Sequence, residues 1–129
     1  NHLNSFFVPS HNTRVFVSGE VDMVSGVGFK AERWPEGVRR DLMDIRWVVS
    51  DLCVLDFDGP ERAVQVRSLH PGVSFEQVQE NTGFPLLKSA QLHETAHPTP
   101  EQLALIRRLD PHDYRATAIK GNPPGIRTA

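Results

Sequence analysis

The segment from His93 to His97 reads HETAH and matches the H-E-x-x-H motif of zinc proteases. In that motif two histidines on one face of a continuous helix bind zinc, and the glutamate between them acts as general base. Pro98 directly follows His97, which disfavours a helical conformation at that histidine, and Pro100 comes two residues later. We therefore expect this segment to be a linker, and we assign no metal-binding residue in the chain.

Other side chains capable of chemistry are more simply explained by structural roles. His70 stands in a turn before a proline, and Asp56 and Asp58 end a strand before a glycine, where aspartates favour turns. Cys53 lies in the apolar run VVSDLCVLDF, with no cation beside it in sequence to activate a thiolate. Because the sequence identifies no Ser-His-Asp or Cys-His arrangement, we assign no catalytic residue in this chain.

Composition limits the class of protein. The chain has 129 residues, of which 39% are hydrophobic and 23% charged, and its formal net charge is -2. Fourteen Lys and Arg against sixteen Asp and Glu give no basic excess for binding nucleic acid. No run approaches the roughly 20 apolar residues that cross a bilayer, and no secretory signal is present. With a single cysteine excluding an internal disulfide, we expect a cytoplasmic domain, or part of one, that binds neither nucleic acid nor a membrane.

A strand, a turn and a short helix are predicted in the centre of the chain. Residues Ala63 to Leu69 alternate between apolar and polar types, as in a half-buried strand, and the sequence HPG then ends the strand. Ser74 and Gln77 have the spacing of a capping box, which predicts a helix from Phe75 to Thr82. Gly83 is placed where a helix ends in a left-handed residue.

The remaining strands are predicted from apolar runs. A leading loop feeds a strand from Thr13 to Ser18, and residues Lys30 to Asp44 form a long surface loop. Asp44 to Phe57 gives one long strand, or two strands in line, that pairs in antiparallel fashion with the strand ending at Leu69. Phe84 to Leu87 is expected to be a last short strand.

A C-terminal helix is predicted from its capping residues. Thr99 is the N-cap, Pro100 takes the first helical position, and Gln102 completes a capping box. The helix ends at Asp110, which precedes a proline. Its apolar stripe consists of Leu103, Ile106 and Leu109. We divide the chain into a domain over residues 1–110 and a tail over residues 111–129.

The order of these motifs resembles a known family. The stretch VVSDLCVLDFDGPERAVQVRSLHPGVSFEQVQENTGFPLL is similar to the C-terminal part of the β subunit of class I CoA-transferases of the glutaconate type. PTPEQLALIRRLDP resembles the closing helix of the family. NHLNSFFVPSHNTRVFVSGEVDMVSGVGF is similar to a narrower branch that includes ring-cleaving hydrolases acting on CoA thioesters in steroid breakdown. The resemblance implies an α/β fold, namely the C-terminal part of a CoA-transferase-like open sheet with flanking helices.

The resemblance also implies partners and a binding region. The expected partners are an α-type CoA-transferase subunit and a missing N-terminal half of the β-type subunit, in a hetero-oligomer with an acyl-CoA substrate. Coenzyme A enters as part of the substrate, and no other cofactor is expected. Asn1 and His2 match a position near the substrate pocket, with Ser5 and Phe6 behind them, although a loop that merely packs against the partner would explain them equally. The catalytic glutamate of the family has no counterpart in this chain.

Three functions follow from the resemblance. In a ring-cleaving hydrolase, which the N-terminal segments favour, a carboxylate acts as base and water attacks a β-diketone-like carbon. In a true CoA-transferase, a glutamate displaces CoA and then forms an enzyme-CoA thioester. The third alternative is a non-catalytic scaffold subunit that keeps the fold for assembly.

Overall fold

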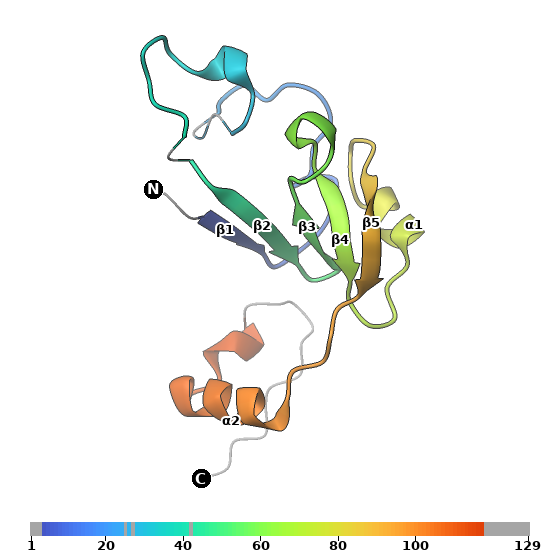
Figure 1. Cartoon of the computed structure of the whole chain (residues 1–129). Coiled ribbons are helices and arrows are strands. Elements are labelled where there is room, and N and C mark those ends of the chain that lie inside the picture. The colour runs from blue at the N-terminus through green and yellow to red at the C-terminus, as the bar shows by residue number, and fades with distance from the viewer. Residues whose placement is uncertain (1–3, 25, 27, 42, 118–129) are drawn as a thin grey trace.

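The fold is an open five-stranded sheet with helices beside it, in the order β1-β2-β3-β4-β5 (Figure 1). The computed structural model describes residues 4–24, 26, 28–41 and 43–117. The strands β1 and β2 are parallel, β2, β3 and β4 are antiparallel neighbours, and β4 and β5 are again parallel. The expected α/β class is confirmed. The strands are β1 (Asn4–Val8), β2 (Ile45–Ser50), β3 (Cys53–Asp56), β4 (Gln65–Leu69) and β5 (Leu87–Glu94).

The apolar run after Asp44 folds back on itself, so the prediction of one long strand, or of two strands in line, is wrong. β2 and β3 form an antiparallel pair in which Val48 lies opposite Leu55. The hydroxyl of Ser50 accepts hydrogen bonds from the backbone N–H groups of Leu52 and Cys53, both at 3.1 Å, and so stabilises the reversal. The predicted antiparallel pairing with the next strand is confirmed, with Cys53 opposite Leu69.

The N-terminal strand lies earlier in the chain than predicted. Residues 13–18 form turns, and the strand is β1, in the part that we predicted to be a loop. The backbone N–H of Phe16 donates to the carbonyl of Asn12 at 2.9 Å, and the Asn12 side chain accepts from the N–H of Arg14 at 3.0 Å. This asparagine turn overrides the strand propensity of the apolar residues Val15, Phe16 and Val17.

The helix α1 (Phe75–Glu80) begins as predicted and ends earlier. The Ser74 hydroxyl accepts a hydrogen bond from the backbone N–H of Gln77 at 3.1 Å, which confirms the N-cap. The C-cap is Asn81. Val78 is completely buried and brings the helix onto the core of the sheet. The buried core cluster consists of Cys53, Leu55, Val66, Val78 and Leu86.

Gly83 does not adopt the predicted left-handed conformation, since its φ angle is not positive. Its N–H donates to the carbonyl of Phe16 at 2.7 Å. A Cβ at this position would lie 2.7 Å from that oxygen and from the backbone nitrogen of Ser18. The glycine is therefore needed for a close backbone approach, a requirement that local sequence does not reveal.

The last strand is longer and later than the predicted Phe84 to Leu87. β5 extends to Glu94, so the first two residues of the HETAH segment are strand, and only the residues after them form the linker that we predicted. β5 pairs with β4 through a register in which Ser68 lies opposite His93.

The helix α2 (Pro100–Leu109) begins as predicted. Thr99 and Gln102 form the reciprocal capping box, and Pro100 lies in the first turn. An extended segment separates α2 from the sheet (Figure 1). No residue of α2 is buried. Among the described residues, no helix combines the length and the apolarity needed to cross a membrane.

Three 3-10 helices complete the described elements: η1 (Ala31–Arg33), η2 (Pro60–Arg62) and η3 (Tyr114–Thr117). Apart from η1, the described residues of the predicted loop, 30–41 and 43–44, are irregular, as expected. The predicted tail begins at residue 111, and its part from residue 118 onwards lies outside the described residues.

Candidate functional site

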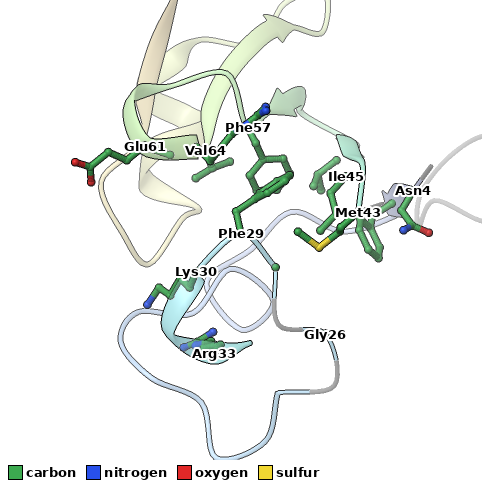
Figure 2. A pocket seen from close by; sticks show the side chains of 15 residues that line it. Asn4, Gly26, Phe29, Lys30, Arg33, Met43, Ile45, Phe57, Glu61 and Val64 are labelled. Atoms are coloured by element: carbon green, nitrogen blue, oxygen red, sulfur yellow. The ribbon is translucent and has the colours of Figure 1, made fainter. Parts of the chain in front are cut away.

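A cavity of about 960 Å³ opens beside β1 and β2 (Figure 2). Most of the residues that line it are apolar, and four charged side chains line it as well. The apolar lining consists of Phe6, Phe29, Met43, Ile45, Val48, Phe57, Ala63 and Val64. The charged lining consists of Lys30, Arg33, Glu61 and Arg62. Such a cavity suits a ligand with an apolar body and a polar or anionic group.

Two phenylalanines from distant parts of the chain form an aromatic wall. The ring centroids of Phe29 and Phe57 lie 5.3 Å apart in a tilted arrangement. The guanidinium carbon of Arg62 lies 5.4 Å from the centroid of Phe29. The indole N–H of Trp34 donates to the carbonyl of Gly28 at 3.0 Å, which fixes the backbone next to Phe29. Phe29 is therefore in contact with Phe57 and Arg62, and the backbone beside it is held by Trp34.

The turn between β3 and β4 is strained where it meets the cavity. Glu61 and Arg62 have φ angles of 53° and 63°, which side chains other than glycine rarely adopt. A Cβ at Gly59 would lie 2.6 Å from the carbonyl oxygen of Ala63, so the turn closes only around a glycine. Backbone strain of this kind gathers at binding and catalytic sites. In Figure 2 Glu61 extends away from the aromatic wall, so its carboxylate does not face the cavity interior.

Lys30 and Arg33 approach the cavity from the loop that carries η1. Both are paired with Glu20, through distances of 3.4 Å from the Lys30 Nζ and 2.5 Å from an Arg33 nitrogen. The charge of Arg33, followed by that of Lys30, lowers the pKa of the Glu20 carboxyl. Glu20 is exposed and is not part of the cavity lining. Lys30 and Arg33 therefore form a cationic rim of the cavity, and one carboxylate of the same chain balances one of its two positive charges.

The residues predicted to bind substrate are only partly placed. Asn1 and His2 lie outside the described residues. Ser5 and Phe6 are neighbours on β1 and therefore point to opposite faces of the sheet. Phe6 lines the cavity together with Asn4, which has the same strand parity, whereas Ser5 does not line it. Of the two described residues of this group, Phe6 reaches the cavity and Ser5 does not.

Sequence reasoning missed the loop residues that contribute to the site. Phe29, Lys30 and Arg33 line the cavity and Trp34 bonds to its wall at Gly28, and all four fall at the edge of, or inside, the predicted surface loop. Two aromatic residues in an otherwise polar loop were the available signal, because a loop fully exposed to water gains nothing from them.

A buried histidine forms a second polar cluster, away from the cavity lining. The Nδ1 of His11 lies 2.8 Å from the Ser50 hydroxyl, and its Nε2 lies 2.9 Å from the Thr82 hydroxyl. The Thr82 hydroxyl donates its proton to the carbonyl of Val78 at 2.8 Å, so it accepts from the Nε2–H of His11. Burial lowers the pKa of His11, against an opposing effect of Asp51. The imidazole is therefore neutral and fully paired, as in a structural cluster.

The cysteine belongs to this structural cluster. The Sγ of Cys53 lies 3.9 Å from the Nδ1 of His11 and 3.7 Å from the Ser50 hydroxyl. Burial raises the pKa of the Cys53 thiol to about 11. A thiol that stays protonated at neutral pH is a poor nucleophile, which agrees with the structural role predicted for it.

The other singled-out side chains also have structural partners. The Nε2 of His70 donates to the carbonyl of Ser50 at 2.8 Å, and its Nδ1 lies 3.1 Å from the Thr95 hydroxyl. Asp56 accepts a hydrogen bond from the backbone N–H of Asp58 at 3.1 Å, which confirms the turn role predicted for this pair. Within the part of the chain that the structure describes, no three His, Cys, Asp or Glu side chains are grouped as metal ligands are.

No protein-family model matches the chain, whereas individual proteins do. It is 43% identical over 116 residues to the cholesterol ring-cleaving hydrolase IpdB subunit of Rhodococcus jostii, a match that covers 89% of this chain and 45% of that protein. It is 38% identical over 74 residues to a subunit of the 3-oxoadipate CoA-transferase of Pseudomonas knackmussii, covering 57% of this chain and 28% of that protein. The chain thus spans about half the length, or less, of the curated relatives it matches.

A solved structure shows the same arrangement of the chain. The crystal structure of IpdAB from Rhodococcus jostii superimposes with a TM-score of 0.81 at 41% sequence identity. The match covers 93% of this chain and 48% of that one. The five-stranded sheet therefore corresponds to part of a larger fold, which confirms the CoA-transferase-like assignment of the sheet.

Proposed function

The chain belongs to the CoA-transferase-like family of β subunits, and from this premise we propose that it forms part of a subunit acting on acyl-CoA thioesters with an α-type partner. We propose further that the reaction is hydrolytic ring cleavage. The observation that carries this proposal is the extent of the match, because the similarity to the ring-cleaving hydrolase covers 89% of the chain and that to the transferase only 57%.

The cavity supports an acyl-CoA substrate with an apolar acyl group. Its volume of about 960 Å³ lies in the range of small-molecule sites, and the aromatic wall of Phe29 and Phe57 offers apolar surface. Asn1, His2, Ser5 and Phe6 are proposed to form the region near the substrate. The place of Phe6 in the lining supports direct contact for that residue, whereas Ser5 faces away from the cavity and would act from behind it.

The catalytic carboxylate is proposed to lie outside this chain. The one acidic residue in the described lining is Glu61, and its side chain extends away from the aromatic wall (Figure 2). A carboxylate supplied by the rest of the assembly would act as general base, and water would attack a β-diketone-like carbon of the substrate. We propose no cofactor besides the CoA of the substrate and a cytoplasmic location, which agrees with the free thiol of Cys53.

A true CoA-transferase is the second candidate, favoured by the similarity to the 3-oxoadipate CoA-transferase. In this mechanism a glutamate attacks the thioester and CoA leaves as the acyl-enzyme anhydride forms. CoA then attacks the anhydride, which releases the carboxylic acid and leaves a glutamyl-CoA thioester. The acceptor carboxylate attacks that thioester in turn.

The two candidates differ in their need for an acceptor and in a covalent intermediate. The test incubates the assembled α/β protein with acyl-CoA substrates, including cyclic ones, with and without acetate or succinate. CoA transfer, substrate consumption and protein mass are followed, and hydroxylamine is added to trap a thioester. Consumption with water alone and without a trappable adduct supports the hydrolase. Acceptor-dependent exchange with a CoA adduct overturns it in favour of the transferase, and inertness towards all substrates favours the scaffold.

A further inference from the structure

Glu20 of the same chain forms ion pairs with both residues of the cationic rim, Lys30 and Arg33. Glu20 lies outside the lining, yet its carboxylate oxygens contact the Nζ of Lys30 at 3.4 Å and Arg33 at 2.5 Å, and both cations line the cavity. The two contacts use different oxygens of the carboxylate, so Glu20 bridges the lysine and the arginine. A carboxylate or a phosphate oxygen of a ligand would present the same geometry to these cations.

Glu20, Lys30 and Arg33 differ in their exposure to water, and this difference favours replacement of Glu20 by an anionic group of a ligand. The side chain of Glu20 is 74% exposed, that of Lys30 is 56% exposed and that of Arg33 is 29% exposed, so the carboxylate is the partner most open to water. An exposed ion pair is weak, since water screens it and ordering the side chains costs entropy. A ligand whose apolar body fills the cavity could therefore displace Glu20 with its own anionic group.

We propose that Lys30 and Arg33 form an anion-binding subsite of the cavity, which Glu20 occupies when the cavity is empty and which an anionic group of the ligand takes over. The proposal rests on the assignment of the cavity as the ligand site and adds the class of ligand it accepts. That class is an apolar body carrying a carboxylate or a phosphate. The strained turn contributes a further cation, since Arg62 lines the same cavity and stands over Phe29.

The subsite distinguishes anionic from neutral ligands, because only an anionic group can replace Glu20 beside Lys30 and Arg33. A neutral apolar molecule can enter the cavity but gains nothing from displacing Glu20, because the cations would be left without a partner. An anionic molecule exchanges one ion pair for another and keeps its apolar contacts. Lys30 and Arg33 therefore favour anionic ligands over neutral ones of the same shape, and Glu20, which an anionic ligand must displace, reduces that preference.

The test measures binding of three probes to the full protein: 1-naphthoate, its uncharged methyl ester, and adenosine 3′,5′-bisphosphate, which carries the phosphates of CoA. Calorimetry or quenching of tryptophan fluorescence reports binding, since Trp34 borders the cavity through its bond to Gly28. Glu20→Gln should tighten binding of an anionic probe about two- to five-fold, the range expected for removing exposed ion pairs. Arg33→Gln should weaken the same probe about tenfold, as for a lost charge-assisted hydrogen bond. Neither substitution should change binding of the ester.

Glu32→Gln is the matched control, because Glu32 is exposed on the same 3-10 helix and lies outside the Glu20 pairs. A response of naphthoate alone identifies a carboxylate subsite, and a response of the bisphosphate identifies a phosphate subsite. The subsite is disproved if Glu20→Gln weakens all probes equally, or if neither anionic probe responds to Glu20→Gln and Arg33→Gln. These measurements need no turnover. The proposed reaction can therefore fail its own test while the anion subsite is supported, and the subsite can fail while the proposed reaction is supported.

Discussion

The Nε2 of His11 lies 2.9 Å from the hydroxyl of Thr82, although the two residues are 71 positions apart in the chain. The other ring nitrogen contacts Ser50, at a separation of 39 positions. One imidazole therefore joins the segment after β1, the end of β2 and the end of α1. His11 also stacks on Phe16, with ring centroids 4.0 Å apart. This network, rather than a regular element, attaches the N-terminal turns to the sheet.

Replacing Thr82 with Val tests the energetic weight of this link. Valine has nearly the same shape but no hydroxyl, so the Nε2–H of His11 would stay buried without an acceptor. We expect Thr82→Val to lower the free energy of unfolding by about 1–3 kcal/mol, the cost of an unpaired buried polar group. Urea unfolding of the full protein measures it. Thr13→Val, at an exposed position, is the control and should change stability by less than about 0.5 kcal/mol.

The same histidine makes stability depend on pH. Burial lowers the pKa of folded His11 below its ordinary value of about 6.5, so between these two values the unfolded chain binds a proton that the folded chain does not. The contribution is therefore complete above pH 6.5 or so and is lost as the pH falls below it, with a slope of at most about 1.4 kcal/mol per pH unit.

The measurement is the urea midpoint from pH 7.5 to 5.5. His11→Gln should be less stable at pH 7.5 and should lose less stability over this range than the unchanged protein. His97→Gln removes an exposed imidazole outside the network and should follow the unchanged protein. Equal slopes for all three proteins would show that His11 does not govern the acid sensitivity.

Elements with local signals were predictable from the sequence. The caps Ser74 and Thr99 sit where the sequence places them, because each accepts a hydrogen bond from a residue three positions away. The pairing of β3 with β4 was also predictable, since the connection between these successive strands, residues 57–64, contains a Gly-Pro turn signal. The caps and the turn signal lie close together in the chain and leave a readable pattern.

Elements that depend on distant contacts were not predictable. Only Ser50 and Asp51 interrupt the run at the reversal, without the glycine, proline or asparagine of a usual hairpin turn, and β3 is buried on both faces, so its residues do not alternate. Val15, Phe16 and Val17 are an apolar run typical of a strand, yet they lie in a turn and bend held by Asn12 and His11. The cavity joins the loop around Phe29 to Phe57, which follows β3, a pairing that only the folded chain reveals.

The HETAH segment is expected to bind no catalytic zinc. His93 and Glu94 lie at the end of β5, where neighbouring side chains alternate between faces, and the Nδ1 of His93 donates to the carbonyl of Gln91 at 2.9 Å. His97 lies beyond the strand, so the two histidines do not share a helical face. Elemental analysis should find the same zinc content in the unchanged protein and in His97→Ala. Chelation should leave the thermal stability of the unchanged protein as it was. About one zinc per chain that is lost in His97→Ala would contradict this expectation.

The contact between Gly83 and the N-terminal turns gives the last prediction. The N–H of Gly83 donates to the carbonyl of Phe16 at 2.7 Å, and a Cβ there would lie 2.7 Å from that oxygen, so Gly83→Ala must push the backbones apart. The displaced backbone includes the turn that carries Phe16 against His11, so the loss should spread to the histidine network.

We expect Gly83→Ala to lower the free energy of unfolding by about 1–3 kcal/mol, as overpacking of a tight contact does. Gly26→Ala is the matched control, since a Cβ at Gly26 meets nothing within 4 Å and its φ is not positive. Thr82→Val combined with Gly83→Ala should cost less than the sum of the two, because both release the same segment. Additive losses measured by urea unfolding would show that the Gly83 contact and the His11 network hold this segment independently.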